Sequence, residues 1–286
     1  MSFSLVLNST NVIGVNNNTY VYNFVKGNFT IPEGSEMIVS SCQIPYSFYN
    51  ITSAYNNNQF QFSWPTGTNT YTTSTITIPD GFYTTTSLNA YLQQWCISNG
   101  YYLVNASGQN VYYYSLQYNA YQYGNQLIGA VVPTSLPGGY TQPSNFAGFP
   151  TTARTPYLTM LSNNFTTYLG FTAGNYGINQ TVAYSANSNQ TPVGSTVNSI
   201  CIRCSLVKNN VGIPMDLLDS FPIANTSFGA NINYNPQVAK WVSLNSGSFA
   251  NFAITFSDQN LNLINALDSN ILLTLLIRFP NKNNEK

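Results

Sequence analysis

The stretch ITIPDGFYTTTSLNAYLQQWCISNG, residues 76–100, decides how the rest of the chain is interpreted. It opens with isoleucines at alternate positions, which is the period of a half-buried strand, and continues with Pro-Asp-Gly at residues 79–81, three residue types that favour a turn. The hydroxyl side chains of residues 84–87 can cap the start of a helix, and Gly100 suits the left-handed position just beyond a helix end. We therefore predict a strand, a turn and a helix in succession.

Apolar side chains within this stretch recur at helical spacing. Leu88, Tyr91, Leu92, Trp95 and Cys96 occupy positions i, i+3, i+4, i+7 and i+8, which lie on one face of an α-helix. The chain is thus expected to contain one short amphipathic helix.

Most other patterned segments have the signature of strands, being short, rich in β-branched and aromatic residues, and bounded by turn-forming residues. They are residues 2–7, 19–25, 36–44, 59–64, 70–78, 101–104, 111–118, 127–132, 198–207, 240–244, 252–256 and 271–279. This composition predicts an all-β fold, an antiparallel sandwich or roll.

The middle of the chain carries weaker signals. Residues 133–156 are rich in proline and glycine, residues 157–171 are compatible with a short helix before Gly170, and residues 174–195 have the polarity of an exposed loop. We expect a single domain over residues 1–286, with a loop-rich insertion at about 119–195.

Charge is the most unusual feature of the composition. Only 6% of the 286 residues are charged, eight basic and eight acidic, and there is no histidine, whereas about 25% charged residues is usual. A surface so poor in charge has little repulsion to keep molecules apart. It is compatible with a secreted or surface protein that has an Asn/Thr-rich face, but we predict a subunit whose surface is largely covered by neighbours. The absence of a basic footprint argues against nucleic-acid binding.

The sequence also bears on the compartment. The first residues, MSFSLVLNSTNVIG, lack a basic region followed by a long apolar run, so no secretion signal is expected. The longest apolar run, residues 271–279, is too short to span a bilayer and contains Arg278. We therefore predict synthesis in a cytosol-like compartment and no membrane span.

Four cysteines are scattered along the chain at Cys42, Cys96, Cys201 and Cys204. The last two form a CxxC pair, but residues three apart on a strand point to opposite faces, and no histidine is present to complete a metal site. We predict four buried free thiols, and no metal or cofactor site.

Candidate catalytic residues are equally scarce. Asp216 and Asp219 are the acids most able to converge, yet their segment, DLLDSF, is interpreted as capping a turn. A serine or cysteine nucleophile would lack its usual histidine base. We therefore predict no enzymatic activity and assign no catalytic residue.

Tyrosines gather in one region, and they remain the best candidates for contacts. Tyrosine offers a large amphipathic surface at small entropic cost, so these side chains are interpreted as a contact surface or a sugar-stacking platform, or else as core on one face and ordinary exposed tyrosine on the other. They are Tyr112, Tyr113, Tyr114, Tyr118, Tyr121 and Tyr123.

Several motifs together resemble the single jelly-roll penton and minor capsid proteins of virophages, Polinton-like elements and related large double-stranded DNA viruses. The similar features are an aromatic-Asn step followed by an Asn-rich turn, an Ile-Pro-Asp-Gly strand end before a helix with spaced leucines, a Leu-Gly-Phe step and a closing hairpin. In this chain they are Tyr49-Asn50, residues 56–58, residues 78–83 with Leu88 and Leu92, residues 168–171, residues 256–258 and residues 271–279.

The resemblance implies an eight-stranded jelly-roll β-sandwich with long inserted loops. It further implies a structural capsid subunit that forms homopentamers at icosahedral vertices, contacts the major capsid protein, and is assembled into the virion in the host cytoplasm. The alternative is a carbohydrate-binding or host-attachment β-sandwich that uses exposed tyrosine and tryptophan.

Overall fold

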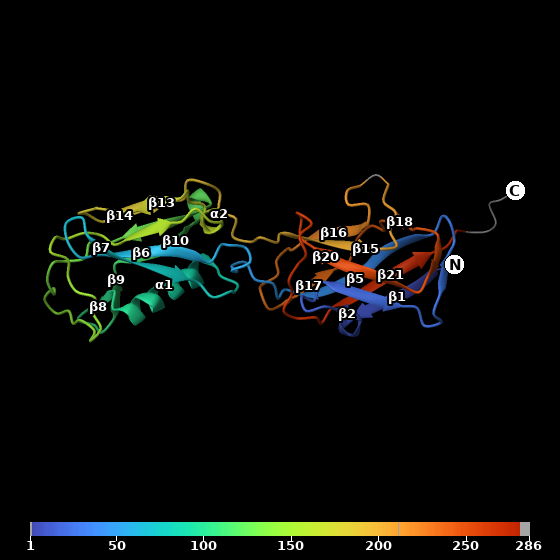
Figure 1. The fold of residues 1–286 in the computed structure, drawn as a ribbon, viewed down its shortest axis with the longest axis horizontal. Helices are drawn as coiled ribbons and strands as arrows, with labels where there is room; N and C mark the ends of the chain where they lie inside the picture. Colours follow the sequence, from blue (N-terminus) through green and yellow to red (C-terminus); the bar gives the residue numbers. More distant parts are fainter. Residues whose placement is uncertain (1, 211, 281–286) are drawn as a thin grey trace. The chain divides into compact units, whose positions relative to one another are not determined.

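The computed structural model describes residues 2–210 and 212–280. It divides the chain into two compact units, each with its own strands (Figure 1). Unit 1 consists of Met1–Phe48 together with Val197–Lys286, and unit 2 is Tyr49–Thr196. Unit 2 is therefore inserted into the sequence of unit 1.

This division differs from the expected single domain over residues 1–286. The insertion begins at Tyr49 rather than near residue 119, and it contains a sheet, a helix and a core of its own. The alternation of residues 59–64 and 70–78 predicted these strands, but a period of two does not say which sheet a strand joins.

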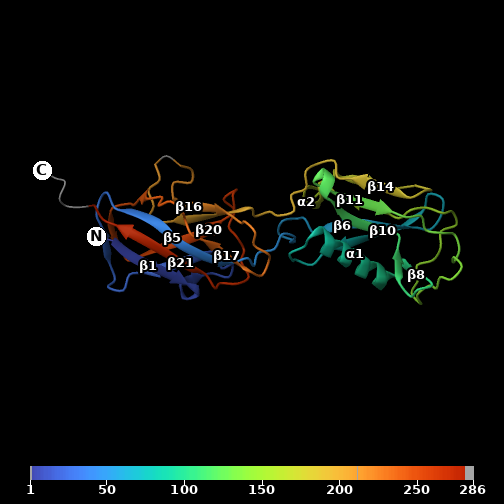
Figure 2. The same ribbon diagram turned by 180° about the vertical axis from the view of Figure 1, so that it is seen from behind.

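Unit 1 contains two antiparallel sheets of four principal strands each. The first has the order β1 (Ser2–Asn8), β21 (Leu272–Arg278), β5 (Glu36–Pro45), β17 (Asn231–Tyr234), and β18 (Val242–Ser243) also pairs with β5. The second has the order β16 (Leu217–Pro222), β15 (Ser199–Cys204), β20 (Asn251–Ser257), β3 (Thr19–Asn23), β2 (Val12–Ile13). A short ribbon joins β4 (Phe29–Ile31) to β19 (Gly247–Phe249), and η1 (Ser9–Asn11) is a 3-10 turn. Figure 2 shows the first sheet from behind.

The order of these strands is that of a jelly roll. If the principal strands β1, β3, β5, β15, β16, β17, β20 and β21 are numbered one to eight along the chain, the sheets have the orders 1-8-3-6 and 5-4-7-2. Two sheets linked in this way form an eight-stranded roll of two Greek keys. The prediction of an all-β antiparallel jelly roll is confirmed for unit 1, and unit 2 is inserted between its third and fourth strands.

Alternation along the strands builds the core of the roll. In β1, Leu5 and Leu7 are buried while their neighbours are exposed or half-buried, and they lie opposite Leu275 and Leu273 of β21. Because each strand has one apolar face, the two sheets bury these faces against each other.

Unit 2 also consists of antiparallel sheets. One has the order β13 (Gly174–Tyr176), β12 (Tyr157–Met160), β6 (Gln59–Pro65), β7 (Tyr71–Thr77), and a second has the order β10 (Tyr114–Asn119), β11 (Gly124–Gly129), β14 (Tyr184–Asn187). A short ribbon pairs β8 (Tyr102–Val104) with β9 (Asn110–Tyr112). The helical elements are α1 (Thr85–Asn99), η2 (Ala120–Gln122) and α2 (Phe165–Leu169).

Helix α1 is the predicted amphipathic helix, and its ends are where the sequence placed them. Thr84 and Ser87 form a reciprocal capping box at the start, and Gly100 adopts the left-handed conformation at the end, with φ 72°. The helix buries Leu88, Leu92 and Cys96 in the core of unit 2. Its position beside β6 and β10 is visible in Figures 1 and 2.

Two segments differ from their predicted conformation. Residues 174–195, expected to be an exposed loop, contain β13 and β14, and the segment DLLDSF forms β16 rather than a turn. In these strands polar residues interrupt the alternation of apolar and polar side chains by which a strand is recognised. Pairing with neighbouring strands stabilises them. The short helix predicted before Gly170 is present as α2.

Candidate functional site

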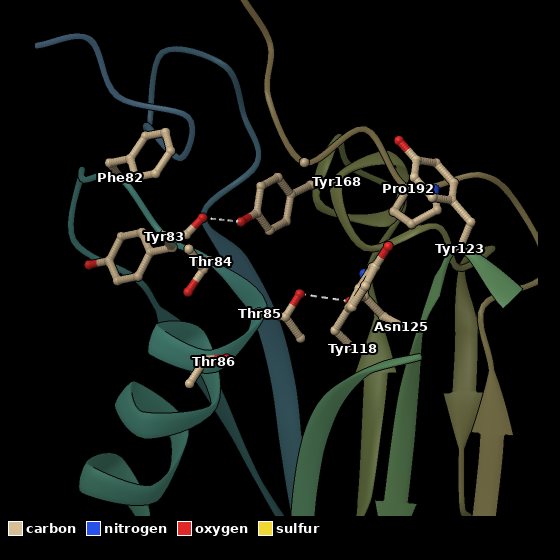
Figure 3. Close-up of a pocket in the computed structure, with 11 residues that line it drawn as sticks. Phe82, Tyr83, Thr84, Thr85, Thr86, Tyr118, Tyr123, Asn125, Tyr168 and Pro192 are labelled. Carbon is tan, nitrogen blue, oxygen red and sulfur yellow. Dashed lines mark hydrogen bonds between the residues drawn. The ribbon is translucent and has the colours of Figure 1, made fainter. Parts of the chain in front are cut away.

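A cavity of about 410 Å³ opens in unit 2 beside the first turn of α1 (Figure 3). Side chains from five segments of unit 2 line it, and all of them are uncharged. They are Phe82, Tyr83, Thr84, Thr85, Thr86, Tyr118, Tyr123, Asn125, Tyr168, Pro192 and Gly194. Its volume is within the usual range of ligand pockets, about 300–1,000 Å³.

The buried amide of Asn50 holds two walls of this cavity together. Its Nδ2 donates to the carbonyl oxygens of Tyr83, at 2.7 Å, and Gly194, at 2.9 Å. Its Oδ1 accepts from the backbone N–H of Tyr83 at 2.8 Å. A buried amide with its donors and acceptor satisfied is a rigid support, so Asn50 fixes the segment before α1 against the segment at Gly194.

Two further buried polar side chains complete the support. The hydroxyl of Tyr168 donates to the carbonyl oxygen of Tyr83 at 2.6 Å, and burial raises the pKa of this phenol to about 12. Asn125 accepts a 2.7 Å hydrogen bond from the hydroxyl of Thr85 and donates to the carbonyl oxygen of Leu169 at 2.9 Å. These side chains act as donors or acceptors within unit 2 and fix the shape of the cavity.

The rim is formed by tyrosines that retain much of their surface. Tyr118, near the end of β10, is 53% exposed, and Tyr123, just beyond η2, is 68% exposed. The backbone of Tyr123 is left-handed, with φ 46° and ψ 54°, a conformation uncommon for residues other than glycine. In the view of Figure 3, Tyr118 and Tyr123 lie on the side of the cavity opposite Tyr83 and Thr84.

The predicted tyrosine cluster therefore divides into distinct environments. Tyr113 and Tyr114 are buried in the core, because the ladder is interrupted between β9 and β10 and both side chains turn inward. Tyr118 and Tyr123 meet at the cavity, while Tyr121 is fully exposed and does not line it.

A second hollow, of about 510 Å³, lies on unit 1 along the edge strand β1. We call it the aromatic groove. Its lining residues are Ser2, Phe3, Ser4, Leu5, Tyr22, Phe24, Val25, Lys26, Asn28 and Phe29. The rings of Phe24 and Phe29 stack at a centroid distance of 4.7 Å, and that of Phe3 meets Phe29 edge-on at 5.7 Å. Val25 is 95% exposed at its margin.

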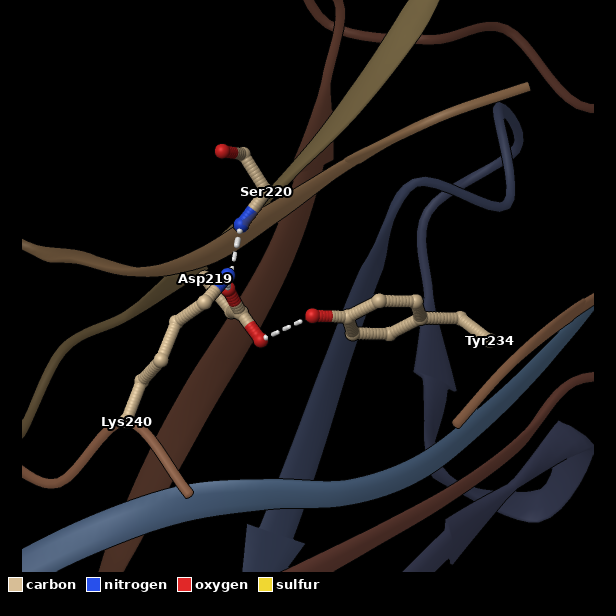
Figure 4. Close-up of polar contacts among 4 residues, drawn as sticks. All are labelled: Asp219, Ser220, Tyr234 and Lys240. Carbon is tan, nitrogen blue, oxygen red and sulfur yellow. Dashed lines mark hydrogen bonds and ion pairs between the residues drawn. The ribbon is translucent and has the colours of Figure 1, made fainter. Parts of the chain in front are cut away.

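The acids singled out in the sequence do not converge on one another. Asp216 pairs with Arg203, whose guanidinium is 2.9 Å away. Asp219, whose side chain is 4% exposed, pairs with the ammonium group of Lys240 at 2.9 Å and accepts a 2.8 Å hydrogen bond from the hydroxyl of Tyr234 (Figure 4). Each carboxylate pairs with a different basic side chain, so the two acids form separate structural ion pairs.

The thiols of the CxxC pair are buried in β15. Burial raises the pKa of Cys204 to about 12 and also raises that of Cys201, which disfavours the thiolate that metal binding and nucleophilic attack require. Within residues 2–210 and 212–280, no group of three or more acidic, cysteine or histidine side chains is placed to hold a metal ion. No helix in the same ranges is both long enough and apolar enough to cross a membrane.

No protein-family model and no curated protein matches the sequence. Among solved structures, the chain is similar to the mavirus penton protein, with a TM-score of 0.45 and 11% identity, covering 98% of this chain and 100% of that chain. It is also similar to a chain in the structure of the Sputnik virophage, with a TM-score of 0.40 and 14% identity, covering 97% of each chain.

Proposed function

We propose that the protein is a structural subunit of a viral capsid, a penton protein that forms homopentamers at icosahedral vertices. The observation that carries the proposal is the strand order 1-8-3-6 and 5-4-7-2 of unit 1. This eight-stranded roll is the fold of many capsid subunits, although lectins and cupins share it. The role is one of assembly and not of catalysis.

The charge of the chain supports assembly. Unit 2 contains a single acid, Asp80, and a single base, Arg154, among residues 49–196. Its surface polarity comes from amides, hydroxyls and phenols, which form hydrogen bonds without mutual repulsion. Contacts of this kind depend little on salt, whereas exposed ion pairs are screened over about 8 Å at physiological ionic strength.

The aromatic groove is the proposed contact between neighbouring copies. Strand β1 lies at the edge of its sheet, so one side of its backbone has no strand partner within the described part of unit 1. An apolar groove beside an open strand edge is suited to cover by another chain. A groove on one side of a subunit that meets a different surface of the next is the heterologous contact that closes a ring.

The remaining partners follow from this role. The rim of a vertex pentamer would contact the major capsid protein, and the particle would be assembled in the host cytoplasm, where free thiols stay reduced. Four cysteines that are all buried and free agree with that compartment.

The proposal is tested by native mass spectrometry of the purified chain, with light scattering from low to high salt. We expect a pentamer that persists as salt rises. Val25→Asp, at the margin of the groove, should shift the pentamer to monomer. Val15→Asp is the matched control, because Val15 is also an exposed valine of unit 1, at 91%, and does not line the groove.

Two results would contradict the proposed vertex role: a wild-type chain that stays monomeric or forms trimers, and a ring that dissociates when salt is added. A pentamer unaffected by Val25→Asp would leave the vertex role intact and contradict only the proposed contact at the aromatic groove.

A further inference from the structure

We propose that the cavity beside the first turn of α1 binds one sugar ring of a neutral glycan. The cavity lies wholly within unit 2, so the inference goes beyond the capsid role and does not depend on it. It rests on the character of the rim, on the hydroxyl groups inside it, and on the charge of the surrounding unit.

The rim presents aromatic surface where a sugar ring would stack. Tyr118 and Tyr123 remain half or more exposed although both lie at the cavity. The aromatic ring of tyrosine offers an apolar face, and its hydroxyl is a donor and an acceptor. A pyranose has a matching character, with C–H groups on its faces and hydroxyls around its edge.

Hydroxyl side chains lie inside the rim. Thr86 is exposed in the first turn of α1, and its hydroxyl can donate one hydrogen bond and accept two. Thr84, the N-cap residue, is also exposed, although its hydroxyl already accepts from the backbone N–H of Ser87. The hydroxyl of Thr85 donates to Asn125, which leaves its lone pairs to accept from a ligand. Groups that can both donate and accept suit sugar hydroxyls, which do the same.

The surrounding charge selects a neutral ligand. Asp80 and Arg154 are the charged residues in unit 2, and neither lines the cavity. A phosphorylated, sulfated or sialylated ligand is normally held by lysine or arginine through charge-assisted hydrogen bonds, and the lining offers none. A nucleotide is disfavoured for the same reason, because its phosphates would have no cation.

The cavity is rigid before any ligand binds. Asn50, Tyr168 and Asn125 are all buried and hydrogen-bonded, and they hold the segments that form its walls. The left-handed backbone of Tyr123 directs its ring to the rim at some conformational cost, and strained conformations concentrate at ligand sites. A preformed site loses less entropy on binding than a flexible one.

The test uses the full-length chain. An array of neutral oligosaccharides, built from hexoses and N-acetylhexosamines, is compared with sialylated and sulfated glycans, and neutral hits are then titrated by calorimetry. We expect neutral glycans to bind. Tyr123→Ala and Tyr118→Ala should each weaken the binding by about tenfold or more in Kd.

Tyr121→Ala is the matched control, because Tyr121 is a fully exposed tyrosine of the same segment that does not line the cavity. It should leave Kd unchanged. Thr86→Val removes an exposed hydroxyl while keeping the shape of the side chain, and should also weaken binding. Circular dichroism checks that each variant is folded, so that a lost fold is not mistaken for a lost site.

The proposal is overturned if the wild-type chain binds no neutral glycan up to roughly 10 mM, if it binds only charged glycans, or if Tyr121→Ala weakens binding as much as Tyr123→Ala. The oligomeric state of the same samples is measured in parallel. A pentamer that binds no glycan would refute this inference alone, and a monomer that binds a neutral glycan would refute the proposed capsid role alone.

Discussion

The hydroxyl of Tyr234 donates a 2.8 Å hydrogen bond to the carboxylate of Asp219, and this contact joins the edge strands of the two sheets of the roll. Tyr234 belongs to β17 of the first sheet and Asp219 to β16 of the second. The ring of Tyr234 also stacks on Phe221 at a centroid distance of 4.3 Å. A polar clamp and an aromatic contact thus close one side of the sandwich.

Asp219→Asn should destabilise unit 1 by about 1–3 kcal/mol. Hydrogen bonds to a buried charged acceptor are among the stronger ones, and Tyr234 and Lys240 would no longer have a carboxylate to donate to. Asp216→Asn is the control, since its carboxylate is 36% exposed and pairs with Arg203 at the surface; it should cost less than about 1 kcal/mol. Urea denaturation measures both, and equal losses would show that the clamp contributes nothing special.

Gly100→Ala should destabilise unit 2 strongly. At this helix end φ is +72°, and an added Cβ would lie 1.9 Å from the carbonyl oxygen of Asn145. Gly108→Ala measures the cost of the left-handed backbone alone. Gly108 has φ +76°, and a Cβ added there would meet no neighbouring group within 4 Å. We expect about 1–2 kcal/mol for Gly108→Ala and a further cost of about 1–3 kcal/mol for Gly100→Ala. Thermal unfolding curves of similar midpoint for the two variants would disprove the clash.

Alkaline pH should unfold the protein. Burial raises the pKa of Tyr20, Tyr113 and Tyr168 from 10.0 to about 12. A folded-state pKa above the unfolded value stabilises the fold fully below pH 10, and this stabilisation is lost as pH rises from 10 through 12. With no histidine to titrate near neutrality, the urea midpoint should stay flat up to about pH 8. Above that pH the buried thiols, whose pKa is also raised by burial, begin to add to the loss of stability before the tyrosines do. A midpoint that falls already near neutral pH would contradict this expectation.

All four cysteines should be reduced and slow to react. Each is buried and free, and burial raises the pKa of Cys96 and Cys204 to about 12. A thiol reagent should count four groups in denaturant and react slowly with the folded chain. Cys201 is the most exposed of the four, so Cys201→Ser should remove the fastest phase. Two or fewer thiols, in protein purified without oxidant, would refute the assignment to a reducing compartment.

Local sequence patterns predicted the features that depend on neighbouring residues, namely helix ends and strand positions. The start and end of α1 follow from Thr84 and Gly100, and the alternation of apolar residues located most strands of the roll. The division into two units was missed, because it depends on which strands pair over long distances. One signal was available: between Tyr49 and Thr196 the charges almost vanish, and only Asp80 and Arg154 remain.

The cavity was predictable only in part. The tyrosine-rich segment pointed to Tyr118 and Tyr123, but the same pattern included Tyr113 and Tyr114, which the fold buries. Asn125 could not be identified, because a buried amide is recognised by partners that are remote in sequence: its bond to Leu169 joins residues 44 positions apart. The shape of the cavity depends on tertiary hydrogen bonds between residues that are distant in the sequence.

The bond from Asn50 to the carbonyl oxygen of Gly194, 2.9 Å long, ties the first residues of unit 2 to its last. An inserted domain whose first and last residues lie close together can be replaced by another such domain, because the flanking strands β5 and β15 keep their positions. Residues 49–196 can then change in sequence while unit 1 keeps the registers of its strands. The same junction, between Phe48 and Val197, offers an engineer a place to graft a foreign domain whose termini lie equally close.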